Sequence, residues 1–343
     1  MPTTAPLPSS SVFPLAQPIQ LSLVAPEPLG TQALAEGGSD AVAWRLGQDH
    51  ARHGLPLPAA HLHPSSPLYA GWHAAVARRA SHHRDPSPAQ RQWLQLRLQA
   101  WTEGLRFDER LICPHYLQQL AQKHCPVTRA ELHDEQGHPQ QRCWARLRQH
   151  EGYAAGSLIQ LGATAAAALQ GRSLAQLQAL AVQSLRQAEP VLGLDAAAWA
   201  RLVSLVAMVS PEADLLGVQA LLPPNRLHLR HATHALQAWL TRQLDHAGWS
   251  QRLQAMHERL GGVPQRQAAT GLFAALAPHA LCLPHGEPER RWALEDLWQD
   301  ARVQRRWLAL VELLSPLTVE RLLRELPAPA GWVMERHGEQ LAA

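Results

Sequence analysis

Lysine is almost absent from this 343-residue chain, because Lys123 is the only lysine among its 31 basic residues. A Walker A phosphate loop requires the pattern GxxxxGK[ST], and the residues around Lys123 do not fit it. A Schiff-base mechanism requires an activated lysine amine, so it is disfavoured as well. The sequence also lacks the GxGxxG, HExxH, GxSxG and CxxC patterns. It therefore shows no dinucleotide-binding, zinc-protease, serine-hydrolase or thiol-redox signature.

Cysteine is scarce too, with four residues at positions 113, 125, 143 and 282, which are too few and too scattered for a disulfide scaffold. The first three are separated by 11 and 17 residues, unlike the Cys-x2–4-Cys spacing of a zinc knuckle. We therefore expect buried free thiols and no cofactor. A structural zinc remains the alternative, and its candidate ligands are Cys113, Cys125, Cys143, His115, His124 and His133.

Long apolar runs are missing as well. The run at 199–209 is interrupted by Arg201 and falls short of the ~20 residues that a membrane-spanning helix needs. Residues 1–15 contain neither lysine nor arginine, so they lack the positively charged start of a secretory signal. We expect a cytoplasmic protein with no membrane partner.

The net charge of +3 is unevenly distributed along the chain. Residues 41–150 carry 14 basic against 8 acidic residues, a surplus of six, whereas residues 151–343 carry 17 of each. Such a basic block is where an anionic partner is expected to bind, although a solvated surface explains it as well. The candidate phosphate contacts are Arg45, Arg52, Arg78, Arg79, Arg84, Arg91, Arg97 and Arg146.

The pattern of apolar residues predicts a mainly α protein. Residues 1–40 are rich in Pro, Ser and Gly and predict an irregular arm, and residues 41–110 predict a basic region of helices separated by Pro-rich loops. From 172 to 343, apolar residues recur at spacings of three and four, which predicts an all-α domain of several helices. Within it, Asp195 is expected to cap a helix that ends at Val209.

Residues 111–171 differ in pattern and predict a small α+β insert. They contain the run Cys125-Pro126-Val127-Thr128, the pair Arg146-Leu147, the Gly152-Tyr153-x-x-Gly156 turn and an apolar strand at 158–161. These features resemble the HNH (His-Me finger) endonuclease-like proteins of bacterial mobile elements. The resemblance is confined to this segment, and it implies a finger made of a hairpin followed by a helix.

The polar positions of the family pattern are not kept. The Asp before Arg is replaced by Ala145, the Asn after the second Gly by Ser157, and the Asn and Lys of the helix by Ala166 and Leu169. Hydrolysis at an HNH site needs a His as general base and side chains that hold a divalent ion. Three histidines lie nearby but not at the motif position, namely His133, His138 and His150. We therefore expect the finger to be catalytically inactive.

Together these features predict a non-catalytic nucleic-acid-associated or adaptor protein. Its partner is DNA, RNA or a protein that acts on them, and the resemblance implies a mobile-element or phage-defence setting. Two alternatives stay open: an active metal-dependent nuclease of HNH type, and a pure protein–protein interaction subunit of a larger complex. Two further features are interpreted as structural: the histidines at 228, 231 and 234, expected on one helix, and the 12 tryptophans, expected in the core.

Overall fold

The computed structural model describes residues 39–78, 85–211, 226–326 and 333–334, all within the unit that runs from residue 34 onward. The predicted arm at 1–40 lies outside the described residues, apart from Ser39 and Asp40, which begin a helix. Within the described part, thirteen α-helices account for most of the structure, so the prediction of a mainly α protein is confirmed. In that same part, no helix is long and apolar enough to span a membrane.

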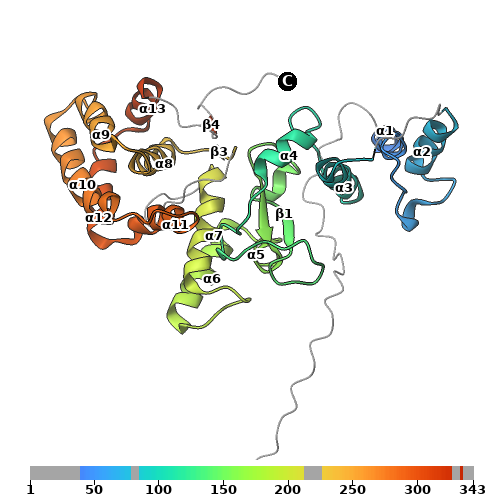
Figure 1. The fold of residues 1–343 in the computed structure, drawn as a ribbon, viewed down its shortest axis with the longest axis horizontal. Coiled ribbons are helices and arrows are strands. Elements are labelled where there is room, and N and C mark those ends of the chain that lie inside the picture. The colour runs from blue at the N-terminus through green and yellow to red at the C-terminus, as the bar shows by residue number, and fades with distance from the viewer. Residues whose placement is uncertain (1–38, 79–84, 212–225, 327–332, 335–343) are drawn as a thin grey trace, which may run out of the picture. The chain divides into compact units, whose positions relative to one another are not determined.

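The basic N-terminal region folds into α1 (Ser39–Arg52), α2 (Pro67–Ala77) and α3 (Pro88–Thr102). Helices α1 and α2 pack closely because two glycines face the opposite backbone (Figure 1). A Cβ atom at Gly47 would lie 2.0 Å from the carbonyl oxygen of Leu68, and one at Gly71 would lie 1.9 Å from that of Trp44. Ser87 caps α3, because its hydroxyl accepts from the amide of Gln90.

The predicted α+β insert contains α4 (Pro114–Leu120), β1 (Arg142–Arg146), β2 (Leu158–Gly162) and α5 (Ala163–Leu169). Strands β1 and β2 pair antiparallel, with Ala145 opposite Ile159, and α5 follows β2 directly. We call residues 125–171, which include this hairpin and helix, the finger. Gly156 has a φ of +83° in the connection between its strands, and a Cβ atom there would lie 2.1 Å from the ring of His228.

The remaining helices are α6 (Leu174–Gln187), α7 (Ala196–Val209), α8 (Ala232–Leu244), α9 (Trp249–Glu258), α10 (Val263–Leu281), α11 (Glu289–Asp296), α12 (Ala301–Val311) and α13 (Pro316–Glu325). The side chain of Asp195 accepts from the amide of Ala198 at 2.7 Å, so the predicted cap of α7 is confirmed. One correction concerns the all-α prediction, because β3 (His228–Leu229) pairs in parallel with β4 (Val333–Met334).

The strand β3 also corrects the prediction that three histidines share one helix. His228 lies in β3, His231 precedes α8, and only His234 lies within that helix. The backbone amide of His228 donates to Gly156, and the amide of Arg230 donates to Met208. These long-range hydrogen bonds hold the segment extended, and the local three-residue spacing could not reveal them.

Two large apolar cores organise the chain from the finger onward. The first joins the finger to α6, α7 and the start of α8, and it includes Val127, Leu161 and Trp199. The second lies among α8 to α13 around Trp239 and Trp298. The first core continues across residue 171, where the sequence placed a boundary between two domains. Finger and helices therefore share their interior, and Figure 1 shows α5, α6 and α7 following one another beside β1.

Candidate functional site

The finger contains an apolar interior where the HNH pattern would hold its metal ion. Ala145 on β1 is 8% exposed and belongs to the first core. On α5, Ala166 packs against the same core and Leu169 is 1% exposed within it. None of these side chains has an oxygen, nitrogen or sulfur atom that could bind a cation. The arrangement can support packing but cannot hold an ion at these positions.

Ser157 is the one polar side chain at the replaced positions, and it is fully buried. Its hydroxyl donates to the carbonyl of Ala154 at 3.2 Å, and its own carbonyl accepts from the amide of Leu147 at 2.9 Å. Both bonds stay inside the loop that joins β1 to β2. Ser157 therefore fixes the shape of this loop.

The Cys-Pro-Val-Thr turn is anchored from two sides. The amide of Gly162, at the end of β2, donates to Sγ of Cys125 at 3.3 Å. The buried Arg201 of α7 donates through Nε to the carbonyl of Val127 at 2.6 Å. Burial lowers the pKa of Arg201, with the neighbouring Arg129 adding to the effect. The turn that carries the family resemblance thus serves as a structural joint between the finger and α7.

The three cysteines named as alternative zinc ligands each have a separate local environment. Sγ of Cys113 accepts from the amide of Tyr116 and caps α4, and Cys125 has the bond to Gly162 described above. Burial raises the pKa of the Cys143 thiol. Across the part of the chain that the structure describes, no three His, Cys, Asp or Glu side chains form a group suited to a metal ion.

Three of the predicted phosphate contacts are exposed: Arg45 on α1, Arg78 at the end of α2, and Arg91 in the first turn of α3. Among the residues described, none of the three has a carboxylate within ion-pair distance. Arg52 is exposed and pairs with Asp49 at 3.1 Å, one turn earlier on α1. Arg79 and Arg84 lie outside the described residues.

Arg97 and Arg146 lie differently from the other predicted contacts. The guanidinium of Arg97 is 5% exposed and reaches Asp49 at 2.6 Å and Glu109 at 2.7 Å. That of Arg146 donates to the carbonyl of Gln149 and lies 3.5 Å from Glu103. Both cations are already satisfied inside the protein, so neither is available to a phosphate. These two expected contacts are therefore corrected to structural roles.

A network of charged side chains that the sequence did not reveal joins the finger to α11. Arg129 has a left-handed backbone, with φ of +62°, and donates to both carboxylate oxygens of Asp296 at 2.7 and 2.6 Å. It also lies 3.1 Å from the buried carboxylate of Glu295, which Arg291 approaches at 3.2 Å. Burial raises the pKa of Glu295, while both arginines act in the opposite sense.

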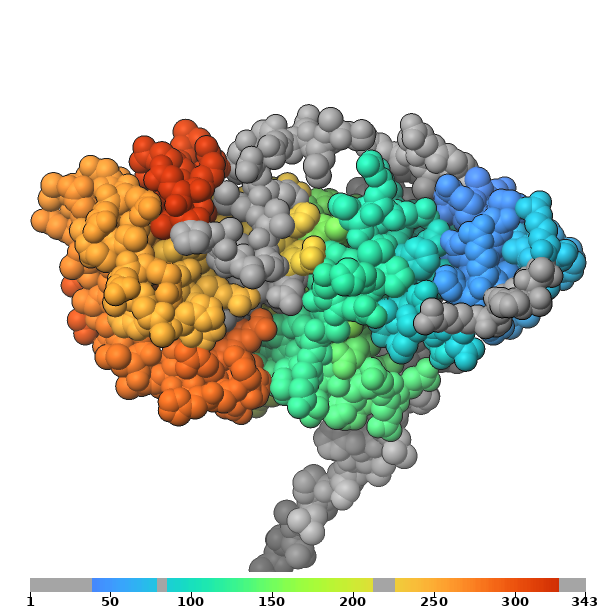
Figure 2. Space-filling model, turned by 45° about the horizontal axis from the view of Figure 1, so that its top comes forward, coloured from blue at the N-terminus to red at the C-terminus, as the bar shows by residue number. Residues whose placement is uncertain are grey.

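This junction borders a cavity of about 420 Å³. Residues 119–126 line one side of it and residues 287–295 of the α11 segment line the other. In Figure 2 the green surface of the finger region meets the orange surface around α11. We call this cavity the α4–α11 groove. Its side chains include the indole of Trp292 and the imidazole of His124, whose ring centroids lie 5.7 Å apart.

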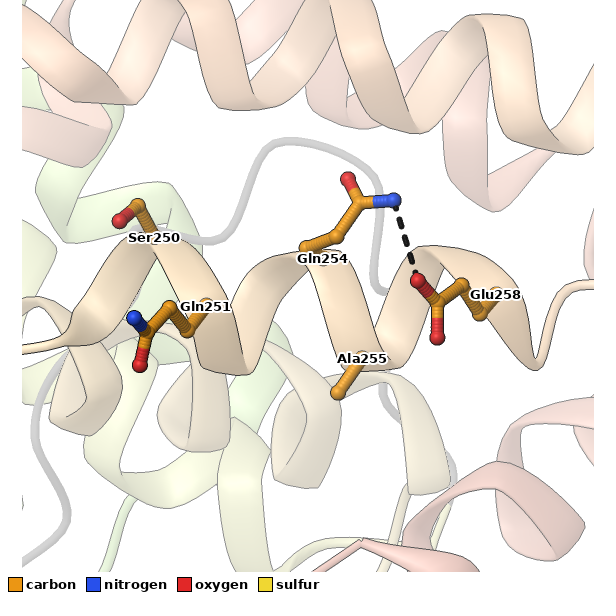
Figure 3. A pocket seen from close by; sticks show the side chains of 5 residues that line it. All are labelled: Ser250, Gln251, Gln254, Ala255 and Glu258. Carbon is orange, nitrogen blue, oxygen red and sulfur yellow. Dashed lines mark hydrogen bonds between the residues drawn. The ribbon is translucent and has the colours of Figure 1, made fainter.

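A second, shallower depression lies on α9 alone (Figure 3). Ser250, Gln251, Gln254, Ala255 and Glu258 line it, and Gln254 donates to Glu258 at 3.3 Å along the helix. All of these side chains come from one helix, and they include one carboxylate and no histidine, cysteine or cation. The depression offers little chemistry, and the finger and the α4–α11 groove are the better candidates.

Comparison with known proteins gave no matching family model, no matching curated protein and no matching solved structure. The resemblance to HNH proteins therefore rests on the residues quoted from the sequence.

Proposed function

We propose that this protein is a non-catalytic nucleic-acid-associated protein in which a degenerate HNH-like finger serves as a scaffold. The observation that carries the proposal is the apolar interior around Ala145, Ala166 and Leu169. Metal-assisted hydrolysis of a phosphodiester needs ligands for the ion and a general base beside the attacked phosphate. These side chains supply neither, and burying an uncompensated cation among them would cost several kcal/mol or more.

The hairpin followed directly by a helix supports the HNH-like assignment, because the resemblance implies that order of elements. It occurs at β1, β2 and α5, the residues for which it was expected. The finger shares its core with α7, so its present use is to hold neighbouring elements in place. The mobile-element or phage-defence setting rests on the resemblance alone.

The phosphate contacts are assigned to the exposed arginines of the N-terminal helices, Arg45, Arg78 and Arg91. An arginine without a carboxylate partner keeps its five N–H donors and its charge available for a phosphate. Each phosphate that such a side chain neutralises releases counterions from the nucleic acid. The affinity of the complex then falls steeply as the salt concentration rises.

The test is the salt dependence of binding to a labelled 20-base-pair duplex, as DNA and as RNA. The variant Arg45→Glu, Arg78→Glu, Arg91→Glu should bind at least ten-fold more weakly than the wild type. Its plot of log K against log salt should be flatter by about three phosphate contacts, at ~0.9 each for B-DNA. The matched control, Arg302→Glu, Arg305→Glu, Arg321→Glu, makes the same charge change on exposed residues of α12 and α13. If both triple variants lose affinity equally, the contact face is wrong.

A protein partner is the second candidate, and one surface feature favours it. Helix α6 exposes Val182 at 46% and Leu185 at 71%, three positions apart on one side of the helix. If the wild-type protein binds neither duplex at any salt concentration, a pure adaptor role replaces nucleic-acid binding. Cleavage of plasmid DNA with Mg²⁺ or Mn²⁺, abolished by a chelator, would instead establish the nuclease alternative.

A further inference from the structure

The α4–α11 groove has the size and composition of a ligand site. Its volume of about 420 Å³ falls within the range of ~300–1,000 Å³ that is usual for small-ligand pockets. The lining is mixed, with Leu120 and Pro288 beside glutamines, two aromatic rings and charged groups. Such a combination of apolar walls and a few polar groups both holds a ligand and orients it.

The two rings form a corner inside the groove. The planes of Trp292 and His124 meet at 82°, so a flat group stacked on one ring presents its edge to the other. Trp292 is half-buried, and the guanidinium of Arg129 lies over its ring with 5.5 Å to the centroid. Because Asp296 and Glu295 fix Arg129, the indole is held in place before a ligand arrives. Such preorganisation lowers the entropic cost of binding.

Charged groups of both signs line the same groove. The ammonium group of Lys123 is 72% exposed and forms only a loose pair with Glu131 at 3.8 Å, which competes weakly with a phosphate. Arg291 lines the α11 side and is oriented by Glu295. Glu287 is exposed beside it and can accept from the amino group of a base. Lys123 also belongs to the basic block at 41–150.

We infer that the α4–α11 groove binds one unstacked nucleotide of a single-stranded segment. The base stacks in the corner formed by Trp292 and His124, and its phosphate contacts Lys123 and Arg291. A base inside a duplex cannot enter, because its faces are covered by its neighbours in the stack. The inference rests on the proposed function and extends it, since it gives the protein a preference for single strands that the exposed arginines alone would not create.

The experiment compares binding of a ten-nucleotide dT strand with binding of a ten-base-pair duplex, for the full chain at one salt concentration. The variant Trp292→Leu should bind the strand at least about five-fold more weakly, the lower end of what one stacked base contributes. It should bind the duplex within two-fold of the wild type. Lys123→Ala, which alters an exposed side chain and leaves the fold intact, should weaken strand binding in the same direction. Trp249→Leu, at a half-buried indole outside the groove, is the matched control.

Four outcomes overturn the inference. The groove has no role if both Trp292→Leu and Lys123→Ala bind the strand like the wild type, or if strand and duplex binding fall equally. Equal competition by thymidine monophosphate, at the same nucleotide concentration, would make the ligand a free nucleotide. In these three cases the duplex binding assigned to the arginines still stands. If the wild type binds neither strand nor duplex, the proposed function fails together with the inference.

Discussion

The finger and the N-terminal helices belong to the same basic block, yet they use their arginines differently. In the finger, Arg129, Arg146 and Arg148 each reach a carboxylate of the protein. On the N-terminal helices, Arg45 and Arg91 face solvent with no such partner among the described residues. The surplus of six charges in the sequence is therefore not six charges on one surface. Burial and internal pairing decide which cations remain for a phosphate.

The largest expected effect comes from returning the family's carboxylate to the finger. Ala145→Asp places a charge in the apolar core that β1 shares with α7. We expect a loss of unfolding free energy of about 4 kcal/mol or more, and no nuclease activity. Ala167→Asp, on the exposed side of α5, should cost about 1 kcal/mol, from helix propensity and an anion near the C-terminal end. Urea denaturation followed by circular dichroism measures both, and equal losses would show that position 145 does not lie in a dry core.

The next effect tests the internally paired arginines. Arg129→Ala leaves the buried carboxylate of Glu295 with Arg291 as its remaining listed neighbour and removes both bonds to Asp296. We expect a destabilisation of about 3 kcal/mol, typical of breaking a buried charge pair. Chemical denaturation at neutral pH measures it. A change below about 0.5 kcal/mol, the range of ordinary surface substitutions, would contradict a structural role for this network.

Burial also controls a histidine outside the two basic regions. His234 is 3% exposed, and burial lowers its pKa from 6.5 to about 3, with His231 adding to the effect. The folded state then binds fewer protons than the unfolded state between these values. Stability should therefore fall as the pH drops below 6.5, by up to about 1.4 kcal/mol per pH unit until about pH 3.

The test of this acid sensitivity is the pH dependence of thermal unfolding. His234→Phe should flatten it between pH 4 and 6.5, because the titrating group is gone. The exposed His150, replaced in His150→Phe, is the matched control and should leave the slope near that of the wild type. A wild-type slope in His234→Phe would show that this imidazole is not the group responsible.

The smallest expected effect concerns a single exposed arginine. Arg91→Ala should change the unfolding free energy by less than about 0.5 kcal/mol, because it removes no printed internal contact. It should still lower the salt dependence of duplex binding by about one phosphate contact. Fluorescence anisotropy across a salt series measures that slope. A stability loss without a change in slope would place Arg91 with the internally paired arginines.

Local patterns predicted the helices well, because caps and periodicity act over a few residues. Asp195 capped α7 and the helix ended at Val209, as expected from the sequence. The hairpin and helix of the finger also occur where the resemblance implied them. The role of each arginine was not predictable, because Arg97 meets Asp49 from another helix and Arg129 meets Asp296 from the far end of the chain. For the same reason the extended conformation at His228 was missed.

The account's central claim is that the protein binds nucleic acid without cutting it. The most direct measurement is electrophoresis of end-labelled DNA recovered from its complex with the protein after incubation with Mg²⁺ or Mn²⁺. We predict that the DNA shifts with the protein in a native gel and is full-length in a denaturing gel, with or without chelator. Shortened fragments that disappear when a chelator is present, and persist in a repurified sample, would contradict the account.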